Sequence, residues 1–185
     1  MWAVLVVSHT GQLMEQTALT GSRIGARFAS GYARTLLHVV SIPAVIAMAV
    51  IVFLLALWRG SRRRALWAAG TIAATNASAQ LLKHTLLWRP DFGLSQRWDA
   101  ANTLPSGHTA VAASTAVALV LVVGARWRSL TAWVGALLAA AMGYSTLVCQ
   151  WHRPGDVMAA LLLAVGWGAV AVACGAWAND EPAPG

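Results

Sequence analysis

The stretch LPSGHTAVAAS, from Leu104 to Ser114, places a short polar cluster directly before an apolar run that continues to about Gly124. An apolar run of this length approaches the ~20 residues that cross a bilayer as a helix. Backbone groups in lipid have no water partner, so such a run must be helical. Ionisable groups are costly at a membrane boundary, so a histidine at the start of this helix indicates a functional site.

The composition favours an integral membrane protein over an apolar soluble helical protein. Of the 185 residues, 58% are hydrophobic and only 10% are charged, and the mean hydropathy is +0.63. A soluble domain carries about 25% charged residues. The charge deficit therefore indicates that much of the chain faces lipid.

Five apolar segments are long enough to cross most or all of a ~30 Å hydrocarbon layer as helices. They are residues 36–58, 66–88, 108–125, 130–150 and 156–178. Small residues are frequent in them, which allows helices to pack closely in a membrane. The N-terminal run MWAVLVVSH is too short to span, and we interpret it as the shortened end of a first span. We predict an all-α polytopic membrane helix bundle forming one domain, residues 1–178.

The basic residues predict how this bundle is oriented. The sequences RGSRRR (residues 59–64) and RWRS (residues 126–129) form dense basic loops, which the positive-inside rule assigns to the cytoplasm. The loops at 89–107 and 151–155 then lie on the extracytoplasmic side of the cell membrane, and the polar tail 179–185 is cytoplasmic. This orientation explains the net charge of +7 better than nucleic-acid binding does.

The predicted topology brings three polar clusters to the extracytoplasmic face. They are KHTLLWRP (residues 83–90), PSGH (residues 105–108) and STLVCQWHRPGD (residues 145–156). Asp156 follows His152 by four residues, so its carboxylate can reach one ring nitrogen and leave the other free to attack. His108 can protonate a leaving oxygen. The two histidines thus supply a nucleophile and an acid.

Four further residues supply an anion-binding cradle. Lys83 and Arg89 contribute positive charge, and an arginine fork fits phosphate oxygens. Ser106 adds a hydroxyl, and Gly107 leaves backbone N–H groups open to an anion at a helix start. The combination predicts phosphoryl transfer through a phosphohistidine, with no metal and no cofactor required.

Two plainer interpretations compete with this one. Ser106 fits a simple capping residue of the following helix. Histidines and a carboxylate can also hold zinc, although these lack the usual close spacing of ligands; the four residues concerned are His84, His108, His152 and Asp156.

The three clusters resemble the motifs of the type-2 phosphatidic acid phosphatase superfamily, which includes bacterial acid phosphatases and vanadium haloperoxidases. Its pattern is Lys-x6-Arg-Pro, Pro-Ser-Gly-His and Ser-Arg-x5-His-x3-Asp. The second motif is complete at residues 105–108, and Ser145, His152 and Asp156 match the third. The resemblance implies a six-span fold, with His152 as nucleophile, Asp156 as its orienting partner and His108 as general acid. It also implies a set of phosphate ligands: Lys83, Arg89, Ser106 and Gly107.

The chain departs from the family pattern at two places. Lys83 and Arg89 have five residues between them instead of six, which in a helix with 100° per residue rotates one against the other by about a quarter turn. Pro90 disfavours helical geometry at Arg89, and such a break absorbs the change. In the third motif, Thr146 occupies the arginine position. Arg153 and Arg97 are the candidate substitutes.

A phosphate pocket at the membrane edge favours a lipid phosphate whose tail stays in the bilayer. The sequence predicts a phosphatase acting on a polyprenyl pyrophosphate, phosphatidate or phosphatidylglycerol phosphate type of lipid, and it leaves the oligomeric state open. A phosphotransferase with the same chemistry is an alternative. A non-catalytic membrane protein that binds lipid phosphates is another, and Thr146 is its main support.

Overall fold

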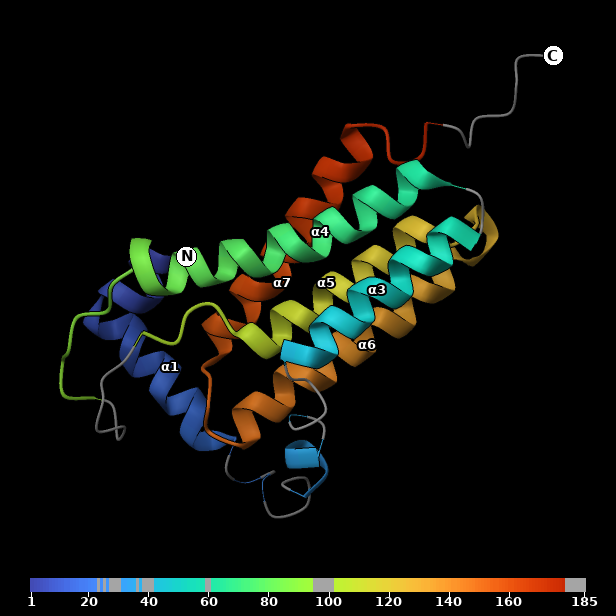
Figure 1. The fold of residues 1–185 in the computed structure, drawn as a ribbon. Coiled ribbons are helices and arrows are strands. Elements are labelled where there is room, and N and C mark those ends of the chain that lie inside the picture. The colour runs from blue at the N-terminus through green and yellow to red at the C-terminus, as the bar shows by residue number, and fades with distance from the viewer. Residues whose placement is uncertain are drawn as a thin grey trace.

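The computed structural model describes residues 1–22, 24, 26, 31–35, 37, 42–58, 61–94 and 102–178. Within those ranges every regular element is a helix. Five helices form a bundle along one axis, and a shorter helix crosses one of its ends (Figure 1). The all-helical prediction is therefore confirmed for the described part of the chain.

The bundle helices lie at the positions of the five predicted segments. They are α3 (Ile42–Trp58), α4 (Arg62–Leu81), α5 (Gly107–Val122), α6 (Ala125–Val148) and α7 (Pro154–Ala173). By length and composition, α6 and α7 can each cross a membrane, and α5 is a shorter apolar helix. Among the described residues, no other helix is both long and apolar enough to do so. The five-span count therefore stays a prediction.

Local sequence signals account for where the helices begin. The Ser61 hydroxyl accepts a hydrogen bond from the Arg64 N–H at the start of α4. Pro154 begins α7, with Asp156 in its first turn. Capping hydroxyls, a first-turn proline and a first-turn acid all favour helix starts.

Helix α5 is the centre of the bundle and packs against α4, α6 and α7, while α3 covers α4 and α5. Alanines dominate the buried contacts, with Ala65, Ala68 and Ala118 in one cluster and Ala113, Ala139 and Ala164 in another. Close packing also requires Gly135, because a Cβ there would lie 2.6 Å from the Cβ of Ala116. The prediction of small-residue packing is thus confirmed.

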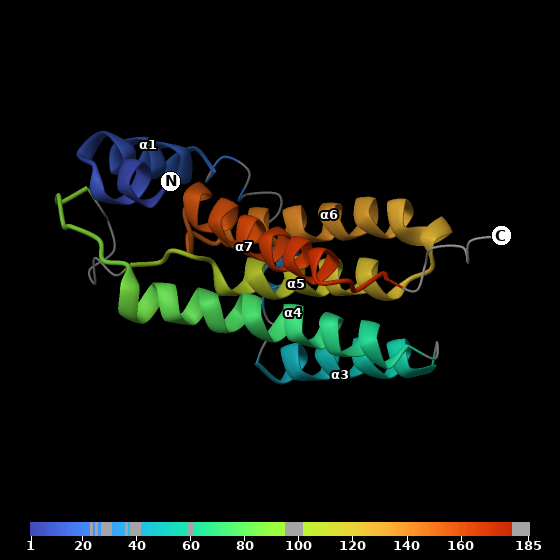
Figure 2. The same ribbon diagram turned by 90° about the horizontal axis from the view of Figure 1, so that it is seen from above.

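The N-terminal part of the chain forms two helical elements that precede the bundle. A five-residue π-helix, η1 (Ala3–Val7), leads into α1 (His9–Gly21), whose first turn is capped by the Ser8 hydroxyl. Figure 2 shows α1 across the end of the bundle where α7 begins. Whether η1 represents a shortened span stays a prediction.

The opposite end of the bundle carries the basic residues. There Arg63 donates a hydrogen bond to the carbonyl of Cys174 at 3.1 Å, and the Arg128 guanidinium lies 3.9 Å from the ring centroid of Trp177. Helices α4 and α6 begin and α7 ends at this end. The basic loops and the three motifs therefore lie at opposite ends, as the topology argument requires.

Candidate active site

The third motif lies in the turn between α6 and α7. The carbonyl of Thr146 accepts hydrogen bonds from the N–H groups of Trp151 and His152, which fold the chain back after α6. The His152 Nδ1 lies 3.3 Å from the Asp156 Oδ2, and the same oxygen accepts from the Arg153 N–H at 2.9 Å. The predicted contact between His152 and Asp156 is confirmed, and it leaves Nε2 of the ring available for chemistry.

The second motif begins α5 and is tied to the third. The Ser106 N–H donates to the carbonyl of Asp156 at 3.0 Å. The Ser106 hydroxyl is fully buried and accepts from the Thr109 hydroxyl at 3.0 Å, and it also caps the helix through the Thr109 N–H. The capping interpretation of Ser106 is confirmed. Gly107 is the first residue of α5 and His108 the second, with the His108 ring 5.6 Å from that of Trp151.

The first motif leaves α4 through a π-helical turn, η2 (Leu82–Leu86), followed by extended chain at Leu87. The Asn102 side chain holds this turn through the carbonyl of Leu87 at 3.1 Å. The assumption of 100° per residue from Lys83 onward is wrong, because a π-helix rotates less per residue and Arg89 lies beyond its end. The expected break before Pro90 is confirmed, and Lys83 lies close enough to Asp156 for their charges to interact.

Arg89 is held by α1. Its Nη2 donates to the Gln12 Oε1 at 2.9 Å, and the Gln12 amide donates to the carbonyls of Pro90 and Val6 at 2.8 and 2.7 Å. Burial and the charge of Arg153 lower the pKa of Arg89 to about 10. Arg89 therefore stays charged at neutral pH while its position is fixed.

Arg153 reaches the site, whereas Thr146 does not replace the motif arginine. The Arg153 side chain is only 2% exposed and donates from Nη1 to the Thr103 hydroxyl at 3.0 Å. Its charge interacts with those of Arg89 and Glu15. Thr146 is fully buried and its hydroxyl donates to the carbonyl of Gly143 within α6. The other candidate, Arg97, lies outside the described residues, as does the predicted tail.

The sequence analysis missed three residues of this site: Gln12, Glu15 and Thr103. The Glu15 Oε1 accepts from the Gly155 N–H at 2.9 Å. A signal was available, because Glu15 is the only acid among the first 90 residues of a chain with six acids. Gln12 and Thr103 carry no comparable local signal.

At this end of the bundle the cationic side chains outnumber the carboxylates. Lys83, Arg89 and Arg153 face the two carboxylates of Asp156 and Glu15. His108 lies within electrostatic range of His152 and Lys83. A group of partly desolvated cations that outnumbers its carboxylates favours the binding of an anion.

The zinc interpretation finds no support in the described residues, among which no group of three or more potential ligands is placed to hold a metal ion. His84 is exposed and its Nε2 lies 3.1 Å from the Gln80 Oε1.

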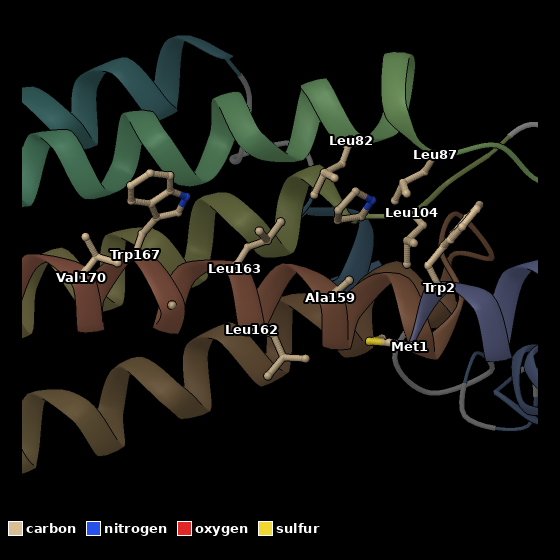
Figure 3. A pocket seen from close by; sticks show the side chains of 12 residues that line it. Met1, Trp2, Leu82, Leu87, Leu104, Ala159, Leu162, Leu163, Trp167 and Val170 are labelled. Carbon is tan, nitrogen blue, oxygen red and sulfur yellow. The ribbon is translucent and has the colours of Figure 1, made fainter.

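An apolar pocket of about 550 Å³ lies beside the polar site, between η2, the chain just before α5, α7 and the N-terminal segment (Figure 3). Pro105, next to Ser106, and Leu82, next to Lys83, line it. Trp167 points from α7 toward α4, where its indole N–H donates to the Ser78 hydroxyl at 3.1 Å. Trp2 forms the other end of the pocket, with its N–H bonded to the carbonyl of Trp88 at 3.0 Å. The apolar pocket is therefore directly adjacent to the polar residues of the site.

A model of the PAP2 superfamily matches residues 64–180, which include all three motifs. The chain belongs to the PAP2 superfamily. Phosphatase-type chemistry is general in the PAP2 superfamily, so the family supports a phosphatase activity for this chain. No curated protein and no solved structure matches the chain significantly.

Proposed function

We propose that this protein is an integral membrane phosphatase that hydrolyses a phosphomonoester or pyrophosphate of a membrane lipid through a phosphohistidine. One observation carries the proposal: the His152–Asp156 pair meets three cations and His108 at the end of the bundle, beside an apolar pocket. The polar part fits a phosphate and the apolar part fits a lipid tail.

In the first step, the His152 Nε2 attacks phosphorus and the bond between phosphorus and the lipid oxygen breaks. Asp156 accepts the Nδ1 proton in a hydrogen bond, which fixes the tautomer and stabilises the charge that develops on the ring. The 3.3 Å separation is long for such a bond, and bonds of this kind commonly tighten when substrate binds. His108 donates a proton to the departing oxygen.

In the second step, water attacks the phosphohistidine. The now neutral His108 takes a proton from this water, the N–P bond breaks and inorganic phosphate leaves. His108 thereby regains the proton that it donated. The cycle balances without a metal ion, because the cations stabilise the phosphoryl oxygens and the two imidazoles handle the nitrogen and proton chemistry.

The cradle for the phosphoryl oxygens comprises Lys83, Arg89 and Arg153, with the backbone of Gly107 at the start of α5. Arg153 takes the part that the missing motif arginine has in the superfamily pattern. Support comes from its burial and its charge interaction with Arg89. One charge-assisted contact contributes roughly 1.5–3 kcal/mol, so a replacement for it matters to activity.

Membrane insertion is supported by the outward-facing surfaces of the long helices. Trp133, Leu137 and Leu138 on α6 are 70%, 67% and 62% exposed, and Leu162 and Val165 on α7 are 60% and 61% exposed. Large apolar side chains facing outward along a helix need lipid around them. We propose five spans and a shortened first one, in a single domain of the cell membrane. With the basic end in the cytoplasm, the site faces the extracytoplasmic side.

The apolar pocket next to the polar site is the reason for proposing a lipid as the substrate. A polyprenyl pyrophosphate, a phosphatidate or a phosphatidylglycerol phosphate each combines a phosphate with a tail that stays in the bilayer. Among these we favour a polyprenyl pyrophosphate or a related cell-envelope lipid. The pocket volume of about 550 Å³ suits the first part of a tail and leaves the rest in lipid.

The test uses the full chain in nanodiscs, assayed for phosphate release from a panel of these lipids in the presence of EDTA. The wild type should release phosphate, and His152→Ala should lower kcat by at least about 10³-fold, because the nucleophile is lost. Denaturing the protein in SDS at alkaline pH after reaction with a lipid ³²P-labelled in the transferred phosphate should trap label on the wild type that is stable in base and labile in acid, and none on His152→Ala. Full activity in that variant would remove His152 as the nucleophile.

Thr146 in the arginine position is the observation that favours a non-catalytic lipid-phosphate-binding protein instead. That alternative predicts binding of the lipid with no phosphate release and no trapped label. A phosphotransferase would trap label but pass it to an added alcohol in preference to water, which product analysis detects.

A further inference from the structure

Helix α1 connects parts of the site that are far apart in the sequence. Gln12 contacts Arg89 and Pro90, Glu15 contacts Gly155, and the carbonyl of Leu19 accepts from the Gln150 amide at 2.9 Å. These contacts run in order along one face of α1 from the first motif to the third. Gln12 and Glu15 are 2% and 6% exposed, so this face is buried against the site.

Glu15 binds at the beginning of α7, one residue before Asp156. Its Oε1 accepts from the Gly155 N–H, one of the first-turn groups that has no partner inside the helix. A carboxylate at this position also interacts favourably with the positive end of the helix dipole. The first turn of α7 is therefore held by two carboxylates, Glu15 from outside and Asp156 from within.

Gly155 makes this contact possible. A Cβ at position 155 would lie 2.9 Å from the Glu15 Oε2, closer than real Cβ atoms approach, and 3.1 Å from its Cδ, so the carboxylate would have to shift. The two residues thus form a matched pair, in which the absence of a side chain on α7 admits the carboxylate from α1.

The charges around Glu15 explain why an acid occupies the position. Among the described residues, Arg153 and Arg89 attract it and Asp156 repels it. Without a bound phosphate the cations of the site repel one another, and a buried carboxylate reduces that repulsion.

We propose that Glu15 is a positioning residue of the phosphatase: through Gly155 it fixes the N-terminus of α7, and with it the His152–Asp156 pair, against the phosphate cradle. This inference rests on the proposed function. It assigns Glu15 no contact with the reacting atoms. Its effect should therefore appear in kcat more than in KM.

The experiment compares Glu15→Ala, Glu15→Gln and the control Thr17→Ala, which changes the exposed face of the same helix. Glu15→Ala should lower kcat by about 10–100-fold with KM changed less than about threefold. Glu15→Gln should recover most of that loss, because an amide oxygen still accepts from the Gly155 N–H. Thr17→Ala should match the wild type. Equal kcat in Glu15→Ala and the wild type would overturn the proposal, as would a Glu15→Gln variant no better than Glu15→Ala.

Gly155→Ala tests the same contact from the other side. Its methyl group would displace the Glu15 carboxylate from the Gly155 N–H, so activity should fall, and the double variant Glu15→Ala/Gly155→Ala should be more active than Gly155→Ala alone because no displaced carboxylate remains. A double variant less active than Gly155→Ala would contradict the pairing.

Two readouts separate this inference from the proposed function. An active wild type, an inactive His152→Ala and an unaffected Glu15→Ala would overturn the role of Glu15 alone. If the wild type releases no phosphate, amide hydrogen exchange over residues 151–158 still tests whether Glu15 fixes the start of α7. Exchange there should quicken in Glu15→Ala and stay near wild type in Glu15→Gln, and unchanged exchange in Glu15→Ala would overturn the positioning role.

Discussion

The two ends of the helical bundle both carry arginines, but they differ in how far those arginines are buried and in what lies beside them. At the basic end, Arg62, Arg63 and Arg126 are exposed, and Arg63 bonds to a backbone carbonyl. At the site end, Arg89 is held by Gln12 and Arg153 is buried against Thr103. Burial beside a histidine–carboxylate pair, rather than the charge itself, distinguishes the proposed binding site from the basic end, which the positive-inside rule assigns to the cytoplasm.

The largest expected effect in this comparison comes from Asp156→Asn. The amide can still accept from the Arg153 N–H, but it no longer stabilises the charge on His152 or fixes its tautomer. We expect kcat to fall by roughly 10²–10⁴-fold, the range for such a change in a catalytic pair, measured as phosphate release. Asp91→Asn, which changes an exposed acid bonded to the Gly93 N–H, is the control and should leave kcat unchanged. A kcat for Asp156→Asn equal to that of the wild type would place the orienting group elsewhere.

The two ends are compared directly by Arg153→Ala and Arg63→Ala. Loss of Arg153 removes the charge-assisted phosphate contact that we propose for it, so kcat/KM should fall roughly 10–100-fold. Arg153→Lys should recover part of it, since a cation remains without the planar fork. Arg63→Ala should stay within about twofold, because its partner is a carbonyl at the far end. Similar losses in both alanine variants would mean that the ends do not differ in function.

A smaller effect on KM is expected from changes in the apolar pocket, which lies along α7 next to the polar site. Trp167→Ala should raise KM for a long-chain lipid phosphate by about 5–10-fold, because burial of a tail against the indole is lost, and leave a short-chain analogue unaffected. Trp133→Ala, on the exposed face of α6, is the control. Equal changes in KM for the long-chain and short-chain substrates would show that the pocket does not bind the lipid tail.

The smallest effect concerns the pH dependence of stability at Glu15. Burial raises the pKa of this carboxyl above its ordinary value of 4.5, which the hydrogen bond from Gly155 partly offsets. A raised pKa gives stability that is fully present below pH 4.5 and is lost as the pH rises through the folded-state value. The Tm of the wild type should therefore fall over this rise relative to that of Glu15→Gln, which has no carboxyl group to ionise. Parallel Tm curves for the two proteins would argue against the shift.

Much of the bundle follows from the local sequence. Apolar runs long enough for helices, a serine before α4 and another before α5, and a proline at the start of α7 each act within a few residues. The i, i+4 spacing of His152 and Asp156 likewise predicts their contact without knowledge of the rest of the chain. Even the alternation of basic and motif-bearing loops is a property of helix order, which predicted that the three motifs meet at one end.

Only the tertiary structure decided how the site is completed. The relative positions of Lys83 and Arg89 depend on the π-helical turn η2, which the average geometry of an α-helix does not predict. The end of this turn is held by Asn102, 15 residues beyond Leu87. Gln12 and Glu15 reach the site because α1 crosses the end of the bundle, and that crossing depends on contacts with residues up to 140 positions away. Hydrophobic periodicity predicts which face of a helix is apolar. It does not predict which distant residues that face will contact, because those contacts depend on how all the helices pack together.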